Sequence, residues 1–158
     1  MEKQLETIKS LIEGVLEKMN VKGDVSVKEG ADCFQFTIKT GEAGMLIGEN
    51  GQHLAALNHI LKKMTENEFR KNGLERVYFM VDINNYQAKK NEELKNLARM
   101  GAQRARYFKK DVTLKPMNSY DRRIIHSALT EYPDIETGSI GREPERRVVI
   151  KPYSMAKD

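Results

Sequence analysis

Apolar residues in the first half of the chain recur at helical spacing, then at strand spacing, then at helical spacing again. The opening helical face consists of Ile8, Leu11, Ile12, Val15, Leu16 and Met19. Alternation over 25–27 and 34–38, on either side of Gly30, predicts a hairpin with one buried face. A second helical face consists of Leu54, Leu57, Ile60, Leu61 and Met64, and a third strand of Val77, Phe79 and Val81. With a short helix around 42–47, we expect the order helix, strand, strand, helix, helix, strand.

The second half of the chain predicts a long helix, a strand, a shorter helix and a closing strand. The long helix runs from Tyr86 to about Lys110. Its apolar side consists of Leu94, Leu97, Ala98, Gly101, Ala105 and Phe108. The later elements are expected around 112–115, 118–130 and 147–151. Asn118 or Ser119 is expected to cap the shorter helix.

A Gly-x-x-Gly turn separates the two adjacent helices of the first half. It consists of Gly48, Glu49, Asn50 and Gly51. Two glycines let the backbone pass close to a sugar-phosphate strand, while the amides that open the next helix point toward negative charge. This turn is the signature of a KH fold, and the order of elements over 1–82 matches the type II arrangement of KH domains.

Charge is distributed unevenly along the 158 residues, whose formal net charge is +4. Residues 1–82 carry a net charge of −2, and residues 83–158 carry +6. We therefore expect the second half to face a polyanion, although a basic surface that is merely solvated is the alternative. The candidate phosphate contacts on the long helix are Lys95, Arg99, Arg106 and Lys110, about 100–160° around the helix from Leu94. Arg146 and Arg147 follow an expected turn at Glu143-Pro144 and form a further basic loop.

Arg122 and His126 lie four residues apart on the shorter helix and so share a face. They border the apolar arc of that helix, where a ligand can reach them. Arg122 is suited to a phosphate contact, and His126 to a stacking or hydrogen-bonding contact. The alternative is a packing pair against the loop before the last strand. Spacing alone favours that alternative.

The residues around this pair resemble an R-3-H domain, named for its Arg-x-x-x-His pair. The resemblance covers residues 116–126, then Gly138-Ser139, Gly141, Pro144 and residues 147–152. The order of a KH domain, a long basic helix and an R-3-H domain resembles the bacterial Jag family over nearly the whole chain. Longer members carry an N-terminal Jag domain, which this chain lacks. The resemblance implies binding of single-stranded RNA, a role in post-transcriptional control, and a link to cell-envelope growth or sporulation.

Other classes of function have little support in the sequence. No Gly-Lys-Ser/Thr follows the glycine turn, the three histidines and Cys33 lack zinc spacing, and no acidic cluster suits two-metal hydrolysis. We expect no cofactor, no metal and no enzymatic activity. Cys33 is expected as a small buried strand residue. The absence of a membrane-spanning run and of a signal peptide indicates a cytoplasmic protein.

The sequence therefore predicts an α+β protein with a type II KH domain at 1–82 and a small α/β R-3-H domain at 84–153. Its expected function is non-enzymatic binding of single-stranded RNA, with single-stranded DNA as a further candidate ligand. The alternative is an adaptor that pairs with another KH protein or with a membrane-associated complex. Acidic Glu49 favours the adaptor, and the basic second half opposes it.

Overall fold

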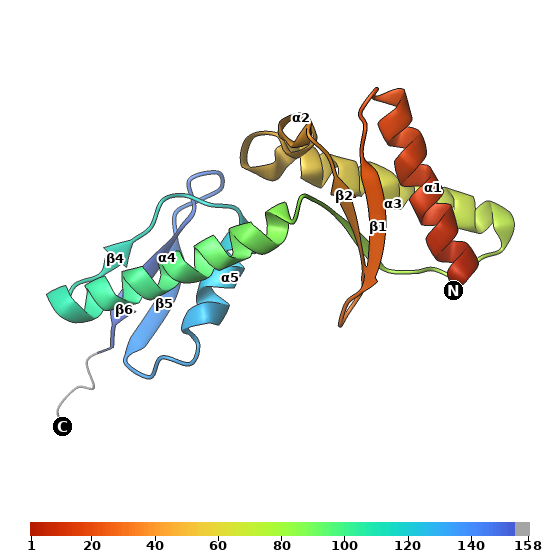
Figure 1. Cartoon of the computed structure of the whole chain (residues 1–158). Helices are drawn as coiled ribbons and strands as arrows, with labels where there is room; N and C mark the ends of the chain where they lie inside the picture. Colours follow the sequence, from red (N-terminus) through yellow and green to blue (C-terminus); the bar gives the residue numbers. More distant parts are fainter. Residues whose placement is uncertain (154–158) are drawn as a thin grey trace. The chain divides into compact units, whose positions relative to one another are not determined.

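The computed structural model describes residues 1–153, which form two compact units divided between Gln87 and Ala88. The first unit contains α1 (Glu2–Lys18), β1 (Asp24–Glu29), β2 (Phe34–Lys39), α2 (Ala43–Ile47), the 3-10 turn η1 (Glu49–Gly51), α3 (Gln52–Asn72) and β3 (Phe79–Ile83) (Figure 1). This order is the predicted order of a type II KH domain.

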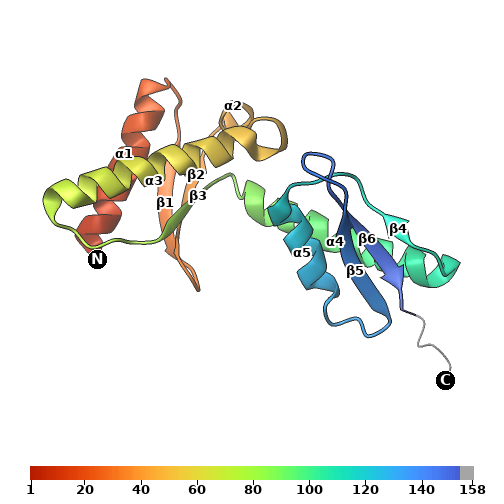
Figure 2. The ribbon, with the colours of Figure 1, turned by 180° about the vertical axis from the view of Figure 1, so that it is seen from behind.

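The sheet of the first unit has the strand order β1-β2-β3. β1 and β2 are antiparallel and form the predicted hairpin, while β2 and β3 are parallel. A parallel pair needs a crossover connection, and α2, η1 and α3 supply it. α1 and α3 lie on the same face of the sheet, as the view from behind shows (Figure 2). The core between them contains Ile8, Ile12, Leu16, Phe36, Ile38, Leu61, Val81 and Ile83, all less than 4% exposed.

Several apolar residues that were predicted to face this core are exposed. Ile60 and Met64 on α3 face solvent, and the buried positions continue instead through Leu61, Thr65 and Phe69. Val27 on β1 is also exposed, so the hairpin buries fewer residues than the alternation of apolar positions predicts. Cys33 lies just before β2 and is half-buried, so the prediction of a buried strand cysteine was wrong.

The second unit contains α4 (Tyr86–Phe108, most of which follows Gln87), β4 (Val112–Thr113), α5 (Ser119–Leu129), β5 (Ile135–Ile140) and β6 (Arg147–Pro152). Its sheet has the order β4-β6-β5, and both neighbouring pairs are antiparallel. β5 was not predicted. Its sequence Ile-Glu-Thr-Gly-Ser-Ile has apolar residues only at its two ends, so it shows no alternation. Backbone pairing with β6 holds it in the sheet.

A close approach between α4 and β6 organises the core of this unit. Small residues Ala98, Gly101, Ala102 and Ala105 form the buried stripe of α4. A Cβ atom placed on Gly101 would lie 2.4 Å from Ile150 Cδ1, so any larger residue at 101 would require the Ile150 side chain to shift. Ile125, Leu129, Val148 and Ile150 complete the core from α5 and β6.

α4 ends two residues before the predicted boundary, and its last turn extends past the core. Phe108 was predicted on the apolar side but is 63% exposed, because the buried stripe ends at Ala105. Lys110 lies beyond the helix. None of the helices within residues 1–153 combines the length and the apolar character that crossing a membrane requires.

Candidate nucleic-acid interface

The Gly-x-x-Gly turn of the first unit has a backbone that requires its glycines. Gly48 has φ +71° and Gly51 has φ +78°, in the region that favours glycine. Asn50 between them also has positive φ (+52°), which asparagine tolerates better than most residues. The turn closes with a hydrogen bond from Gly51 N to Gly48 O (3.3 Å). The exposed side chains of Glu49 and Asn50 therefore project from a backbone fixed at both ends.

The His53 imidazole packs against this turn. His53 Nδ1 is 2.7 Å from the carbonyl oxygen of Met45, which ties the first turn of α3 to α2. A Cβ atom on Gly48 would lie 2.4 Å from His53 Cγ, so the ring occupies the space that any other residue at 48 would need. The His53 ring is exposed, and its contacts also hold the turn in place.

Arg122 is buried rather than accessible at the border of the apolar arc. The residue is 7% exposed. Its Nη1 donates to the carbonyl oxygen of Met117 (2.6 Å), and its Nη2 donates to Glu143 Oε1 (2.5 Å). Glu143 belongs to the loop that joins β5 to β6, and its side chain is 58% exposed. Arg122 therefore does not lie at the accessible border that the sequence indicated, because its guanidinium is held by loop residues on both sides, while a contact with RNA stays a prediction.

His126 lies one turn further along α5 and contacts β5. One ring nitrogen, Nδ1, is 2.8 Å from Thr137 Oγ1, and the other, Nε2, is 3.0 Å from Ser139 Oγ. Thr137 and Ser139 are two residues apart on a strand, so their side chains lie on the same face. Both ring nitrogens therefore have partners within the protein, and the half-buried ring can offer a ligand only its faces.

The environment of His126 favours the neutral imidazole. Burial is the main cause that lowers the pKa of His126, and the positive charge of Arg122 lowers it further. Either tautomer suits a hydroxyl on each side, since a hydroxyl both donates and accepts. A neutral ring between two hydroxyls is suited to stacking and not to a charged phosphate contact.

The N-terminus of α5 is fixed by two further interactions. Asn118 is the N-cap, as predicted, and its Oδ1 accepts from Asp121 N (2.9 Å). The buried Asp121 carboxylate pairs with Lys90 Nζ of α4 at 3.0 Å. These contacts orient the first turn of α5, from which Arg122 and Arg123 project. The partners Glu143, Thr137, Ser139 and Lys90 were not predicted, because each lies on another element.

Most of the other predicted phosphate contacts have partners within the second unit. Arg106 Nε and Nη2 donate to the two carboxylate oxygens of Asp134, and its guanidinium lies 4.8 Å from the centre of the Tyr132 ring. Lys95 pairs with Glu92, and Arg147 pairs with Glu145. Arg99 donates to Asn96, and Arg146 donates to the carbonyl oxygen of Gly141.

Another set of exposed cations has neither an ion-pair partner nor a side-chain hydrogen bond among residues 1–153. In the second unit this set is Lys89, Arg104, Lys109, Lys110, Lys115, Arg123, Arg142 and Lys151. Only Lys110 was among the predicted contacts. Sequence charge counts could not separate the two sets, because a count does not show which side chains lie within ion-pair or hydrogen-bond distance of each other.

Near the end of α4, Tyr107 is 82% exposed and packs edge-on against Phe108, with ring centres 4.9 Å apart. Unpaired Arg104, Lys109 and Lys110 flank these two rings in the sequence. Exposed aromatic rings beside unpaired cations are the side chains that single-stranded nucleic acids use for stacking and phosphate contact.

Comparison with known families agrees with this division into two units. Residues 7–93 match the KH domain family, and residues 92–152 match the R-3-H domain family. Together with the glycine turn and the Arg122/His126 pair, these matches define a protein of the class in which a KH domain precedes an R-3-H domain.

Curated relatives share this arrangement over most of the chain. The RNA-binding protein KhpB of Clostridium symbiosum is 34% identical over 141 residues, which cover 88% of this chain and 62% of the relative. The RNA-binding protein KhpB of Bacillus subtilis is 32% identical over 148 residues, covering 92% of this chain and 69% of the relative. That of Lactiplantibacillus plantarum is 29% identical, and 41% of its length is covered. The chain belongs to the KhpB (Jag) family and spans between about two fifths and two thirds of these relatives.

Proposed function

We propose that this protein binds single-stranded RNA without catalysing a reaction, and that it acts in the cytoplasm as a post-transcriptional regulator linked to cell-envelope growth or sporulation. Membership of the KhpB family supports this proposal, since relatives are named RNA-binding proteins. Single-stranded DNA is a second candidate ligand. In this proposal, the two domains that bind RNA are a KH domain at 1–82 and an R-3-H domain at 84–153.

The observation that carries the proposal is the excess of positive charge in the second unit. From residue 83 onward the chain has 16 basic and 10 acidic residues. Eight of its exposed cations have neither an ion-pair partner nor a side-chain hydrogen bond among the described residues. Each Lys or Arg that neutralises a phosphate releases condensed counterions, so such cations provide affinity for RNA at low salt.

We assign different tasks to the candidate residues. The unpaired cations neutralise phosphates, and the His126 ring stacks against a base. The guanidinium of Arg122 contacts a phosphate only when Glu143 moves aside, because the Glu143 carboxylate occupies one of its donors. The glycine turn is a weak backbone clamp, since Glu49 repels phosphate. Lys95, Arg99, Arg106, Arg146 and Arg147 contribute less, because each already has a partner within the protein.

Fluorescence anisotropy of a labelled single-stranded oligoribonucleotide tests the proposal directly. The whole protein is titrated at several salt concentrations, with unlabelled single-stranded RNA, duplex RNA and single-stranded DNA as competitors. We expect salt-sensitive binding for which single-stranded RNA competes better than duplex RNA. Absence of binding at low salt would contradict the proposal.

The adaptor function remains the alternative, and the first unit provides its support. That unit carries a net charge of −2, and its turn exposes Glu49. An adaptor uses this turn for protein contact or not at all. Replacement Glu49→Lys separates the two functions, because it strengthens binding to RNA only where the turn approaches phosphate. Glu6→Lys is the matched control, since Glu6 is an exposed α1 residue without an ion-pair partner among residues 1–153.

A further inference from the structure

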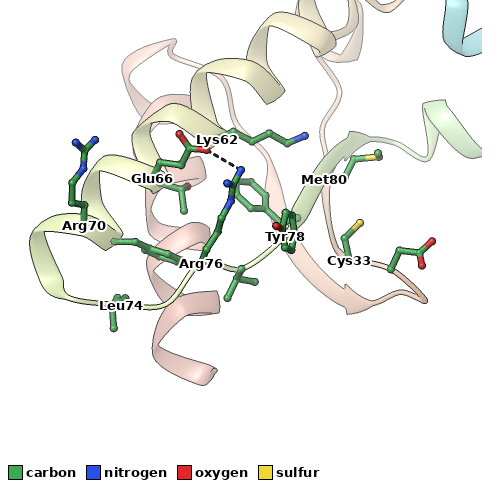
Figure 3. Close-up of a pocket in the computed structure, with 13 residues that line it drawn as sticks. Cys33, Lys62, Glu66, Arg70, Leu74, Arg76, Tyr78 and Met80 are labelled. Atoms are coloured by element: carbon green, nitrogen blue, oxygen red, sulfur yellow. Dashed lines mark hydrogen bonds and ion pairs between the residues drawn. The ribbon is translucent and has the colours of Figure 1, made fainter.

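A cavity of about 590 Å³ lies beside the second half of α3, within the first unit (Figure 3). Lys62, Glu66 and Arg70 border it on the helix, whereas the glycine turn precedes the first residue of α3, Gln52. The cavity therefore lies at the other end of α3 from the turn. None of the RNA-contacting residues assigned above lines it.

The cavity has two rims, one formed by a helix and one by extended chain. The residues on each rim recur at the spacing of the element that carries them. Lys62, Glu66 and Arg70 are spaced by four residues and so lie on one face of α3. Across from them, Arg76, Tyr78 and Met80 alternate along the extended chain that leads into β3, as Figure 3 shows. The floor is apolar and is formed by Phe69, Leu74, Val77 and Phe79.

Three cations, Lys62, Arg70 and Arg76, and two acids, Glu66 and Asp32, line the cavity, so its lining carries a net positive charge. The Glu66 carboxylate accepts hydrogen bonds from Lys63 (3.3 Å) and Arg76 (3.0 Å), so its charge is already balanced. Lys62 and Arg70 have no ion-pair partner in the described part of the chain. The Arg76 guanidinium also lies 5.2 Å from the centre of the exposed Tyr78 ring. A planar cation over an aromatic ring is a surface on which flat rings stack.

Thr65 provides a second observation that points to a polar ligand in this cavity. Thr65 lines the cavity and is 3% exposed, and its hydroxyl oxygen has no hydrogen-bond partner. It is the one buried side-chain polar atom among residues 1–153 that lacks a partner. Buried polar groups in proteins are nearly always hydrogen-bonded, because an unmade bond costs free energy. A ligand with a polar edge at the floor of the cavity would supply the partner once the Thr65 side chain turns toward it, because this oxygen has less than 1 Å² of accessible surface.

We infer that this cavity binds a nucleotide, with the base against the apolar floor and the phosphate held by Lys62, Arg70 and Arg76. A nucleobase has apolar faces and a polar edge, which match the floor and the Thr65 hydroxyl. The phosphate matches the cationic rims. The volume lies within the range of about 300–1,000 Å³ that small-molecule sites occupy. The ligand is either a free mononucleotide or a nucleotide within an RNA strand. This inference does not depend on RNA binding by the second unit.

The rate at which Cys33 is alkylated reports directly whether a ligand occupies the cavity. Cys33 is the single cysteine of the chain, it is half-buried, and its side chain lines the same cavity (Figure 3). The rate of Cys33 alkylation is measured on the whole protein with AMP, adenosine, inorganic phosphate, decanoate or a short single-stranded oligoadenylate. We expect AMP to slow alkylation more than adenosine, phosphate or decanoate. Protection by AMP assigns a free mononucleotide, and protection by the oligoadenylate alone assigns a nucleotide within a strand.

Two substitutions test the contacts by calorimetric titration with whichever nucleotide protects. Arg70→Ala should weaken binding about tenfold or more, the loss expected for a hydrogen bond to a charged group. Lys71→Ala is the matched control, because Lys71 is an adjacent exposed cation that does not line the cavity. Thr65→Val keeps the shape and removes the hydroxyl, so it should weaken binding without loss of thermal stability.

Several outcomes would overturn the inference. Equal protection by phosphate alone would indicate a simple anion site, and stronger protection by decanoate would indicate a site for apolar acids. No protection by AMP or by the oligoadenylate, or equal effects of Arg70→Ala and Lys71→Ala, would show that no nucleotide binds there. RNA binding by the second unit is measured separately by anisotropy, so failure of either proposal is recognised independently.

Discussion

At the scale of single residues, the contribution of Arg122 to the stability of the fold depends on hydrogen-bond partners outside α5. Its guanidinium donates to Met117 O and to Glu143 Oε1, and the side chain is buried. Arg122→Ala removes both hydrogen bonds and leaves a void. We expect the free energy of unfolding to fall by about 1–3 kcal/mol, the range for hydrogen bonds to charged groups. Denaturant titration of the variant measures this loss, with exposed Arg123→Ala as the control. A variant as stable as the control would contradict the structural role.

In the proposed function, Glu143 competes with RNA phosphate for the Arg122 guanidinium. Because its side chain is 58% exposed, Glu143→Gln should leave the fold intact while it removes the carboxylate from Arg122. We expect tighter binding of single-stranded RNA, measured by anisotropy. Glu136→Gln controls for the general change in charge, because Glu136 is an exposed β5 residue without an ion-pair partner among residues 1–153. If Arg122 is only a packing residue, the two variants will bind RNA equally.

His126 should make stability depend on pH in the weakly acidic range. Burial, and then Arg122, lowers its pKa from the ordinary 6.5, so the unfolded chain binds protons more readily than the folded protein. The contribution of His126 is present above this value and is lost as pH falls below it. We expect the free energy of unfolding to fall between about pH 7 and pH 5, and His126→Gln to flatten this dependence. His59→Gln, at an exposed position of α3, is the control variant.

The i, i+4 spacing of Arg122 and His126 was sufficient to predict that they share a face. It could not predict burial, because Glu143, Thr137 and Ser139 come from a loop and a strand that follow later in the chain. The sequence therefore identified the pair but not its environment. The structure supports part of the packing alternative, since Arg122 does contact the loop before the last strand.

At the scale of elements, the junction between α2 and α3 depends on the contact between Gly48 and His53. Gly48→Ala places a methyl group within the His53 ring and forces φ +71° on an alanine. We expect a loss of at least about 1 kcal/mol, the strain of a non-glycine residue in this region. The double variant Gly48→Ala/His53→Ala removes the clash but retains the strain. Denaturant titration of the four proteins should therefore show a coupling energy above about 0.5 kcal/mol. Simple additivity would contradict the contact.

Elements whose apolar residues recur at regular spacing could be predicted from the sequence. An element held mainly by backbone hydrogen bonds to a neighbouring strand could not. α1, α3, α4 and α5 each carry a repeated apolar face, and β1 to β3 alternate. β5 was missed because Thr137, Gly138 and Ser139 interrupt any alternation. Phe108 continues the apolar side of α4 by spacing, but its exposure depends on where the core beneath that helix ends.

At the scale of the whole molecule, the two units differ in charge, and each has a hydrophobic core of its own. The first unit carries −2 and the second +6. The charge difference follows from the sequence alone. The distinction between paired and unpaired cations required the structure. We therefore expect RNA affinity to depend on the unpaired cations of the second unit and not on the total charge of the protein.

The most direct test of this claim is the salt dependence of single-stranded RNA binding by two charge-matched quadruple variants. One replaces the unpaired second-unit residues Arg104, Lys110, Lys115 and Arg123 with glutamine. The other replaces the exposed first-unit residues Lys3, Lys18, Lys39 and Lys71, which also lack ion-pair partners among residues 1–153. The slope of log affinity against log salt falls by about 0.7 for each RNA phosphate that the protein no longer neutralises. We predict a shallower slope and weaker binding for the second-unit variant only. Equal losses in both variants, or a loss confined to the first-unit variant, would contradict the account.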